Sequence, residues 1–351
     1  MLFAQLPTPP AEPDTPKLLS SIRSRTDTAS LDDLPPLVLG GAQFNHQYND
    51  DPFKLPIKDI IKRCFDSGVC AIDTSAYYGP SEVLIGNVLA DPEIRKLYPR
   101  ETYFIITKAG RIAESTFDYS PSWMRQSVER SLTRLHTSYL DIVYAHDVEF
   151  VPLDETLGGI AELFKMKDEG IIRNVGISGY PVPVLIKLAK LVRNKLGRTI
   201  DAVLSYSNFT LQNRLLKFAL QEFHDAGVKK ILNGSPLSMA LLRSQPPHAF
   251  HPASPVLKSK VAQAAMLTAS YNVELADLSM RYALRHWEGT TVVGWSSLFE
   301  VNAGIQSYWD SKNEDLAAED EILIQQVQEI LGDSVDEVWT SGLQDNFDYV
   351  L

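Results

Sequence analysis

The sequence LDIVYAHDVE, at residues 140–149, is a short apolar run that contains β-branched residues and ends in polar ones. An amphipathic stretch, LGGIAELFKMKDEG, follows at 157–170 and ends in glycine, a usual helix stop. A second apolar run, IRNVGISGY, comes next at 172–180. Near-continuous apolar runs are typical of strands buried on both faces. This order therefore predicts two parallel strands joined by a right-handed helical crossover.

The same alternation extends along most of the chain. Apolar runs of this kind occur at 37–44, 70–76, 103–110, 140–149, 172–180, 201–209, 229–237 and 290–297. Stretches with a helical apolar face lie between them, at 57–68, 123–136, 157–170 and 183–197. Eight strands that alternate with helices favour a closed (β/α)8 barrel, the TIM barrel, over an open sheet. Such a barrel takes about 250 residues, so the chain of 351 residues has room for one barrel with extensions.

The predicted barrel occupies residues 35–311 and has an extension at each end. Residues 1–34 are rich in Pro, Ser, Thr and Asp and lack apolar periodicity, which predicts a disordered lead-in. The tail at 312–351 is acidic, and we expect its one predicted helix, at 319–331, to pack on the outside of the barrel. The stretch 238–289 exceeds one crossover, and we expect it to hold a Pro/His-rich loop and two helices.

Composition limits the classes of partner. The formal net charge of −11 predicts that nucleic acid and anionic membranes are not partners, because phosphates would be repelled. The sequence contains neither a membrane-spanning apolar stretch nor the basic and apolar regions of a secretory signal at its start. Cys64 and Cys70 are too few for a disulfide framework or a Cys-rich metal site, which suits a reducing cytosol. We therefore expect a cytoplasmic location.

Three chemically notable side chains lie at the carboxyl ends of successive strands, where the function of an α/β barrel gathers. Asp73, Lys108 and His146 would converge there. A buried lysine is costly unless it is paired, and Asp73 is the obvious partner. Such a pair beside a phenol would lower the tyrosine pKa from about 10, giving a proton donor and acceptor near neutral pH. Tyr77 and Tyr78 both follow Asp73, and the pattern alone does not choose between them.

Other chemistries have less support. The sequence has no HExxH, no Cys/His cluster and no carboxylates at metal spacing, so no metal is predicted. A P-loop, a GxGxxG after a strand and a GxSxG elbow are also absent. Asp147 and Glu149 suggest the carboxylates of a glycosidase, but they lie on one strand and lack a partner from across the barrel.

Several motifs together resemble a known family. DTSAYYGPSE (73–82), ITKAG (106–110) and VYAHD (143–147) resemble the segments that carry the Asp, Tyr, Lys and His of aldo-keto reductases. The resemblance covers about residues 36–306. HDVEF at 146–150, with GISGYP and LSYSNF further on, resembles the aldose 1-dehydrogenase branch. That branch includes D-arabinose and L-galactose dehydrogenases of the erythroascorbate and ascorbate pathways.

The resemblance implies four catalytic residues. The family's tyrosine lies five residues after its aspartate, so Asp73 indicates Tyr78 as the acid/base, and Lys108 and His146 complete the set. The implied reaction is oxidation of a cyclic aldose at C1 to its lactone, with a nicotinamide cofactor bound in extended form across the barrel mouth. Two alternatives stay open: NADPH-dependent reduction of aldehydes or ketones, and a cofactor-binding regulatory subunit.

The resemblance also implies cofactor contacts. Ser178 is expected to hold the carboxamide with help from Ser205, and Gly179 stands in the same set where the family commonly has Asn. The remaining cofactor contacts are expected after the last two strands, at Ser235, Leu237, Gly294, Ser296, Ser297, Glu300 and Gly304.

Glu300 bears on the choice of cofactor. It stands where the family has a basic residue that binds the 2′-phosphate of NADPH. A carboxylate repels a phosphate and accepts a hydrogen bond from a ribose 2′-hydroxyl, so we predict NAD rather than NADP. The other interpretation is that Glu300 is a solvated acid at a helix N-terminus.

The substrate site is less marked in the sequence. Loops after the first, fourth and seventh strands are expected to shape it, with candidate contacts at Gln43, Phe44, Tyr48 and Trp123. The sequence chooses neither between a pentose and a hexose nor between a monomer and a homodimer.

Overall fold

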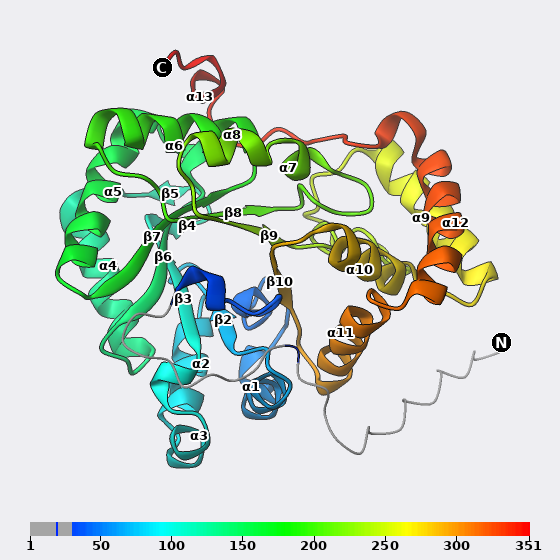
Figure 1. Cartoon of the computed structure of the whole chain (residues 1–351), viewed down its shortest axis with the longest axis horizontal. Coiled ribbons are helices and arrows are strands. Elements are labelled where there is room, and N and C mark those ends of the chain that lie inside the picture. The colour runs from blue at the N-terminus through cyan, green and yellow to red at the C-terminus, as the bar shows by residue number, and fades with distance from the viewer. Residues whose placement is uncertain (1–18, 20–29) are drawn as a thin grey trace.

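The structure, a computed structural model, describes Leu19 and residues 30–351. Eight parallel strands close into a barrel in the order β1-β10-β9-β8-β7-β6-β3-β2 (Figure 1). The barrel strands are β1 (Leu37–Gly40), β2 (Ala71–Asp73), β3 (Phe104–Ala109), β6 (Leu140–His146), β7 (Ile172–Gly179), β8 (Ala202–Tyr206), β9 (Lys230–Gly234) and β10 (Thr290–Gly294). Each lies within one predicted apolar run, so the predicted TIM barrel is confirmed.

Helices surround the barrel. They are α1 (Ile57–Asp66), α2 (Ser81–Ala90), α3 (Pro92–Leu97), α4 (Pro121–Arg134), α5 (Leu153–Asp168), α6 (Val182–Leu196), α7 (Leu215–Phe218), α8 (Leu220–Asp225), α9 (Pro255–Ser270), α10 (Leu275–His286), α11 (Leu298–Asp310), α12 (Glu314–Leu331) and α13 (Gln344–Asp348). All the helices predicted from apolar faces are confirmed. The two helices expected between β9 and β10 are α9 and α10.

The strands are buried on both faces, which explains their near-continuous apolar sequences. In β1, Leu37 and Leu39 face the outer core beneath the helices, whereas Val38 belongs to the core inside the barrel. In β3, Phe104 and Ile106 face that inner core, with Ile105 on the outer side. Side chains alternate between the two cores with the period of two that a strand imposes.

The predicted disordered lead-in falls mostly on residues 1–18 and 20–29, which lie outside the described residues. Its last residues are structured, so the prediction is wrong there. Leu31–Asp33 form a 3-10 helix whose first amides are capped by Ser30. Leu31 and Leu34 are buried in the core inside the barrel. Their apolar side chains therefore close the interior of the barrel, a role that two isolated leucines in a polar stretch did not indicate.

The acidic tail does more than the predicted outer packing. Helix α12 packs against α9 and α10 outside the barrel, as expected. The chain after α12 then runs back across the molecule to α13 (Figure 1). Asp336 pairs with Arg214 at 2.6 Å, and the Asn346 amide donates to the Glu149 carbonyl at 2.9 Å. We call residues 336–346 the C-terminal return.

A short hairpin follows β3 and was not predicted. Its strands are β4 (Arg111–Ala113) and β5 (Thr116–Phe117), which pair antiparallel. The hairpin extends from the carboxyl end of β3 and thus stands beside the barrel mouth. In the part of the chain that the structure describes, every helix is too short or too polar to cross a membrane.

Candidate active site

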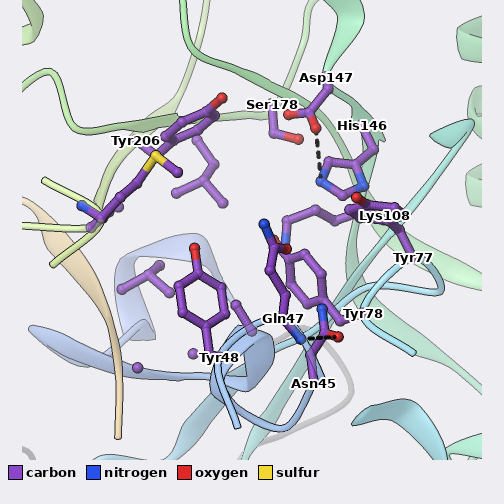
Figure 2. A pocket seen from close by; sticks show the side chains of 18 of the residues that line it. Asn45, Gln47, Tyr48, Tyr77, Tyr78, Lys108, His146, Asp147, Ser178 and Tyr206 are labelled. Carbon is purple, nitrogen blue, oxygen red and sulfur yellow. Dashed lines mark hydrogen bonds and ion pairs between the residues drawn. The ribbon is translucent and has the colours of Figure 1, made fainter. Parts of the chain in front are cut away.

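A cavity of about 1030 Å³ opens at the carboxyl ends of the barrel strands. All four predicted catalytic residues line it: Asp73, Tyr78, Lys108 and His146. Figure 2 shows that Lys108, Tyr78 and His146 lie together on one side, with Tyr48 and Tyr206 across the cavity. The expected convergence of three strand ends is therefore observed, because parallel neighbours in a barrel end at the same rim.

A buried ion pair lies at the base of this group. The Lys108 ammonium donates to Asp73 Oδ1 at 2.5 Å and to the Thr74 carbonyl at 2.8 Å. Strands β2 and β3 are hydrogen-bonded neighbours, which brings Asp73 and Lys108 together across the ladder. Both side chains are almost completely buried. A buried lysine needs such partners, since an unpaired charge in the interior is very costly.

Tyr78 lies directly beside the ion pair. Its ring centroid is 4.7 Å from Lys108 Nζ. Burial raises the pKa of the Tyr78 phenol well above its usual range, and the nearby Asp73 carboxylate adds to the rise. The predicted lowering of this pKa is therefore wrong. The phenol is removed from water, and Asp73 offsets the positive charge of Lys108 that was expected to favour the phenolate.

Tyr77 belongs to a different group. Its ring lies under the guanidinium of Arg111, with 4.1 Å between the Arg111 Cζ and the ring centroid. Its centroid is 6.2 Å from that of Tyr78. Both phenols line the cavity, but the ammonium of Lys108 contacts only the Tyr78 ring among the cation–π pairs of the described residues. The charges in the site thus distinguish two adjacent tyrosines that sequence chemistry alone did not separate.

His146 is held in a neutral form. Burial lowers the pKa of His146 to about 3. Ser75 Oγ accepts the Tyr77 amide proton at 3.1 Å and lies 3.0 Å from His146 Nδ1. In the tautomer in which the Ser75 hydroxyl donates to Nδ1, the imidazole hydrogen lies on Nε2. The Tyr78 and His146 rings meet edge to face with centroids 5.7 Å apart.

The predicted cofactor residues divide into two groups. Ser178, Ser235, Leu237 and Gly294 line the cavity. Among the described residues, the Ser178 hydroxyl makes one long hydrogen bond, 3.5 Å, to the Ala145 carbonyl, so it is available to a ligand. The others do not line the cavity: Gly179, Ser205, Ser296, Ser297, Glu300 and Gly304.

Neighbouring side chains explain why two of these residues, Ser205 and Gly179, do not line the cavity. Ser205 is fully buried, and its hydroxyl accepts from the Asn208 amide at 2.9 Å. A Cβ on Gly179 would lie 2.3 Å from Glu149 Oε2, so the Glu149 carboxyl would have to shift to admit the Asn that the family commonly has here. Glu149 also accepts from the Tyr180 amide at 3.0 Å, and burial raises its pKa to about 8. The Glu149 carboxyl thus occupies the space that a side chain at residue 179 would fill.

Glu300 lies in the first turn of α11, just beyond the cavity. Its carboxylate accepts from the Ser296 amide at 2.6 Å and from the Ser296 hydroxyl at 2.9 Å. Ser297 Oγ in turn accepts from the Glu300 amide at 3.2 Å. Ser297 is the N-cap of α11, and Glu300 is an exposed acid in the first turn, which agrees with the interpretation of Glu300 as a solvated acid at a helix N-terminus. This position also places the negative charge of Glu300 beside the β10 end of the cavity.

Gly304 packs inside the same region. A Cβ there would lie 2.4 Å from the indole of Trp295, so the residue allows close packing of α11 against that ring. Gly304 was expected to contact the cofactor, but it packs against Trp295 and does not line the cavity.

The four candidate substrate residues also divide. Gln43 and Tyr48 line the cavity. Phe44 is fully buried, because the chain turns after β1 and the ring packs into the core between the barrel and the helices. Trp123 lies on α4, where Arg130 covers its ring at 5.2 Å. The predicted substrate contacts of Phe44 and Trp123 are therefore wrong.

Several residues outside the predicted set of contacts also line the cavity. Arg111, from the unpredicted hairpin, and Tyr206, at the end of β8, line the cavity. The C-terminal return contributes Trp339, Thr340, Ser341 and Gly342. Trp339 stacks on the ring of Tyr180 with centroids 4.3 Å apart. A strand-end position was a usable signal for Tyr206, whereas no local pattern indicates that the tail reaches the cavity.

The cavity suits a nicotinamide cofactor together with a small substrate. Ligand pockets span about 300–1,000 Å³, so a cavity of about 1030 Å³ holds more than a monosaccharide alone. The Ser178 hydroxyl, with its long hydrogen bond to the Ala145 carbonyl, offers a partner for a carboxamide. Within the described residues, no group of three or more His, Cys, Asp or Glu is placed to hold a metal ion.

Comparisons with known proteins agree with this geometry. The Aldo/keto reductase family model matches residues 36–324. The chain is 44% identical over 331 residues to D-arabinose 1-dehydrogenase of Saccharomyces cerevisiae, covering 92% of this chain and 98% of that protein. It is 34% identical over 290 residues to L-galactose dehydrogenase of Arabidopsis thaliana, covering 82% and 87%.

Solved structures support the fold alone. An aldo-keto reductase from Bacillus halodurans, in its holo form, superposes with a TM-score of 0.63 at 22% identity and covers 84% of this chain and 92% of that one. A putative aldo-keto reductase from Pseudomonas gives 0.54 at 22% identity, covering 85% and 98%. With the family model matched over most of its length, the chain belongs to the aldo-keto reductases, a family of nicotinamide-dependent enzymes, and is an oxidoreductase that acts on CH–OH groups.

Proposed function

We propose that this enzyme oxidises a cyclic aldose at C1 to the aldonolactone, with NAD as the hydride acceptor. The observation that carries the proposal is the convergence of Tyr78, the Lys108–Asp73 pair and neutral His146 on one face of a large cavity. The choice of an aldose rests on the similarity to the yeast D-arabinose and plant L-galactose enzymes. D-Arabinose and L-galactose are therefore the first substrates to test.

The side chains would divide the chemistry as follows. A nicotinamide cofactor, when bound, supplies the carbon that accepts the hydride from C1. Tyr78, as the phenolate, accepts the proton of the C1 hydroxyl while the C1–O bond becomes a carbonyl. The Lys108 ammonium, 4.7 Å from the ring centroid, stabilises the phenolate, and Asp73 holds the ammonium in place. His146 donates from Nε2 to the C1 oxygen and orients it.

The preference for NAD follows from Glu300. Its carboxylate already accepts the Ser296 amide proton, at 2.6 Å, at the start of α11. The negative charge of Glu300 would repel a 2′-phosphate at this helix end. The Ser296 amide could not bind the phosphate either, because it already donates to Glu300. A ribose 2′-hydroxyl has no charge and can donate to the same carboxylate. The two interpretations of Glu300, a solvated acid at the helix N-terminus and a selector of the cofactor, are thus compatible.

One observation favours a second candidate, reduction of an aldehyde or ketone. The raised pKa of Tyr78 keeps the phenol protonated at neutral pH, which is the form that donates a proton to a carbonyl oxygen. In that direction the same residues would act in reverse. A cofactor-binding regulatory role would not require the buried Lys108–Asp73 pair beside a tyrosine.

We also propose a cytoplasmic location. The chain has two cysteines, Cys64 and Cys70, which are too few for the disulfide framework that is common in oxidising compartments.

The test is a substrate panel. The purified enzyme is assayed with D-arabinose, L-galactose and other aldoses, with NAD and with NADP, and the lactone is identified as the product. A simple aldehyde with NADPH is assayed in the reverse direction. We expect aldose oxidation with NAD to have the highest kcat/KM. A higher kcat/KM for the aldehyde with NADPH would replace the proposal by the second candidate, and no turnover in either assay would leave a binding role.

A further inference from the structure

A buried ion pair forms part of the cavity wall next to the proposed catalytic group. Asp147 directly follows His146, and its Oδ2 lies 2.5 Å from Arg111 Nη1 and 3.5 Å from His146 Nε2. Asp147 and Arg111 both line the cavity, and their side chains are 6% and 16% exposed. The proposed proton transfer uses neither residue, so the pair requires another explanation.

The backbone of Asp147 explains why its side chain reaches the cavity. In a regular strand, residues that follow one another point to opposite faces, so the neighbour of His146 would face the outer core. Asp147 instead has φ 54 and ψ 56, in the left-handed region. Few residues other than glycine adopt this conformation, and Asp and Asn are among those that do. The turn directs two consecutive side chains, His146 and Asp147, into one cavity.

Arg111 is held rigidly in position. Its Nη2 donates to the Glu114 carbonyl at 2.8 Å and its Nε to the Ala113 carbonyl at 3.3 Å, both within the hairpin. The guanidinium also lies 4.1 Å from the centroid of the Tyr77 ring. With three sides of Arg111 engaged, its contact with Asp147 holds the carboxylate at a set position beside His146. Binding sites gain selectivity from groups held in advance in this way.

The Asp147 carboxylate uses one of its two oxygens for its charged contacts. Asp147 Oδ2 takes both of the charged contacts, and Oδ1 has no hydrogen-bond partner among the described residues. Figure 2 shows the Asp147 carboxylate at the edge of the open space, beside His146 and Ser178. One carboxylate oxygen is thus available to a ligand, and a carboxylate accepts hydrogen bonds strongly from hydroxyl groups.

The position of this oxygen identifies the hydroxyl it would bind. If the C1 oxygen of the substrate accepts from His146 Nε2, it lies beside the Asp147 carboxylate, because Asp147 Oδ2 is 3.5 Å from Nε2 and Oδ1 belongs to the same carboxylate. Hydroxyl groups on adjacent carbons of a sugar are close enough to contact two neighbouring side chains. A hydroxyl on the carbon next to C1 therefore reaches the Asp147 carboxylate. Tyr77 and Trp339 line the same cavity and add aromatic surface to its wall.

We propose that Asp147, positioned by Arg111, recognises the hydroxyl on the carbon adjacent to C1 and so selects aldoses over 2-deoxy aldoses and simple lactols. This inference rests on the proposed function, because it assigns a substrate contact within the same reaction. Losing a hydrogen bond to a charged group leaves the carboxylate desolvated and unpaired. That loss lowers kcat/KM by about 10- to 100-fold.

The test compares an aldose with its 2-deoxy analogue. For the wild-type enzyme we expect kcat/KM for the aldose to exceed that for the 2-deoxy analogue by about 10- to 100-fold. In Asp147→Asn this ratio should fall to near one. Asparagine keeps the left-handed backbone and the size of the side chain but replaces one acceptor oxygen and the charge. Arg111→Gln should lower the same ratio by releasing the carboxylate.

The matched control is Asp168→Asn. Asp168 also forms an Asp–Arg pair, with Arg198 at 2.7 Å, but on the exposed helical surface. It should leave the ratio unchanged. The wild-type comparison needs no variant and therefore holds even if a variant fails to fold. Equal kcat/KM for aldose and 2-deoxy analogue would overturn this inference and leave the proposed function intact. No turnover of either sugar would instead remove the proposed function.

Discussion

The ammonium of Lys108 lies 4.7 Å from the centroid of the Tyr78 ring and contacts Asp73 at 2.5 Å. This relationship separates Tyr78 from its neighbour Tyr77, whose ring lies beneath Arg111. A phenolate at residue 78 would lie beside the Lys108–Asp73 pair, and a phenolate at residue 77 would lie beside the Arg111–Asp147 pair. The two tyrosines therefore form a natural pair of test and control.

Tyr78→Phe should retain cofactor binding and lose nearly all turnover. The substitution removes only the hydroxyl, so the ring packing stays while the proton acceptor is lost. General acid–base catalysis contributes about 100- to 10,000-fold, and a fall in kcat of that order is expected. Tyr77→Phe is the control. Its kcat should stay within about 10-fold of the wild-type value, because Tyr77 lies beside Arg111 and not beside the Lys108–Asp73 pair. Wild-type-like kcat in Tyr78→Phe would refute the role of Tyr78.

The rate of oxidation should rise with pH. Burial raises the pKa of Tyr78, so the phenolate that accepts a proton is a minor form at neutral pH. Its fraction grows about tenfold per pH unit below the pKa. The pKa of His146 is lowered to about 3, so the imidazole stays neutral between pH 6 and 9. It therefore does not change the pH dependence of kcat/KM in that range. Measuring kcat/KM for the aldose from pH 6 to 9 checks this, and a flat profile in that range would contradict it.

Glu300→Arg should shift the cofactor preference toward NADP. An arginine at this helix start can pair with a 2′-phosphate, and the substitution frees the Ser296 amide that Glu300 now holds. We expect kcat/KM for NADP relative to NAD to rise by about 10-fold or more. Glu314→Arg, in the first turn of α12, is the matched control because it is also an acid at a helix start. No gain for NADP in Glu300→Arg would remove the argument for NAD preference.

Gly179→Ala should destabilise the protein. The added Cβ would lie 2.3 Å from Glu149 Oε2, in a fully buried position. Overpacking of this kind costs about 1–3 kcal/mol of unfolding free energy. Gly158→Ala in α5 is the control: its Cβ meets only Pro121, at 3.7 Å, and helix propensity alone favours alanine by about 0.5–1 kcal/mol. Urea unfolding of both variants measures the difference; equal stability of Gly179→Ala and wild type would show that the Glu149 carboxyl moves aside.

Trp339→Ala should weaken substrate binding without removing the chemistry. The indole lines the cavity and stacks on Tyr180, so its loss opens the wall formed by the C-terminal return. We expect KM for the aldose to rise several-fold, by up to about 10-fold, with a smaller change in kcat. Trp123→Ala tests the discarded candidate on α4 and should leave KM unchanged. A rise in KM for Trp123→Ala alone would reverse the assignment.

Much of the barrel and of the candidate site could be predicted because both depend on local patterns. Each strand shows an apolar run, and each predicted catalytic residue lies at or just after the end of such a run. Phe44 and Trp123 were misassigned for a related reason. Their proximity in sequence to strand ends and loops gave no information on the direction of the side chain, and an aromatic ring beside the barrel is more often core than contact.

The sequence by itself determined the order of strands and helices, the closed parallel barrel, and the convergence of Asp73, Lys108 and His146. These follow from periodicity and from the rule that parallel strands end at one rim. Only the tertiary structure decided the raised pKa of Tyr78, the left-handed turn that brings Asp147 beside His146, and the return of Trp339 to the cavity. Those features depend on burial, on backbone dihedrals and on contacts between residues far apart in the chain, which no local pattern of residues records.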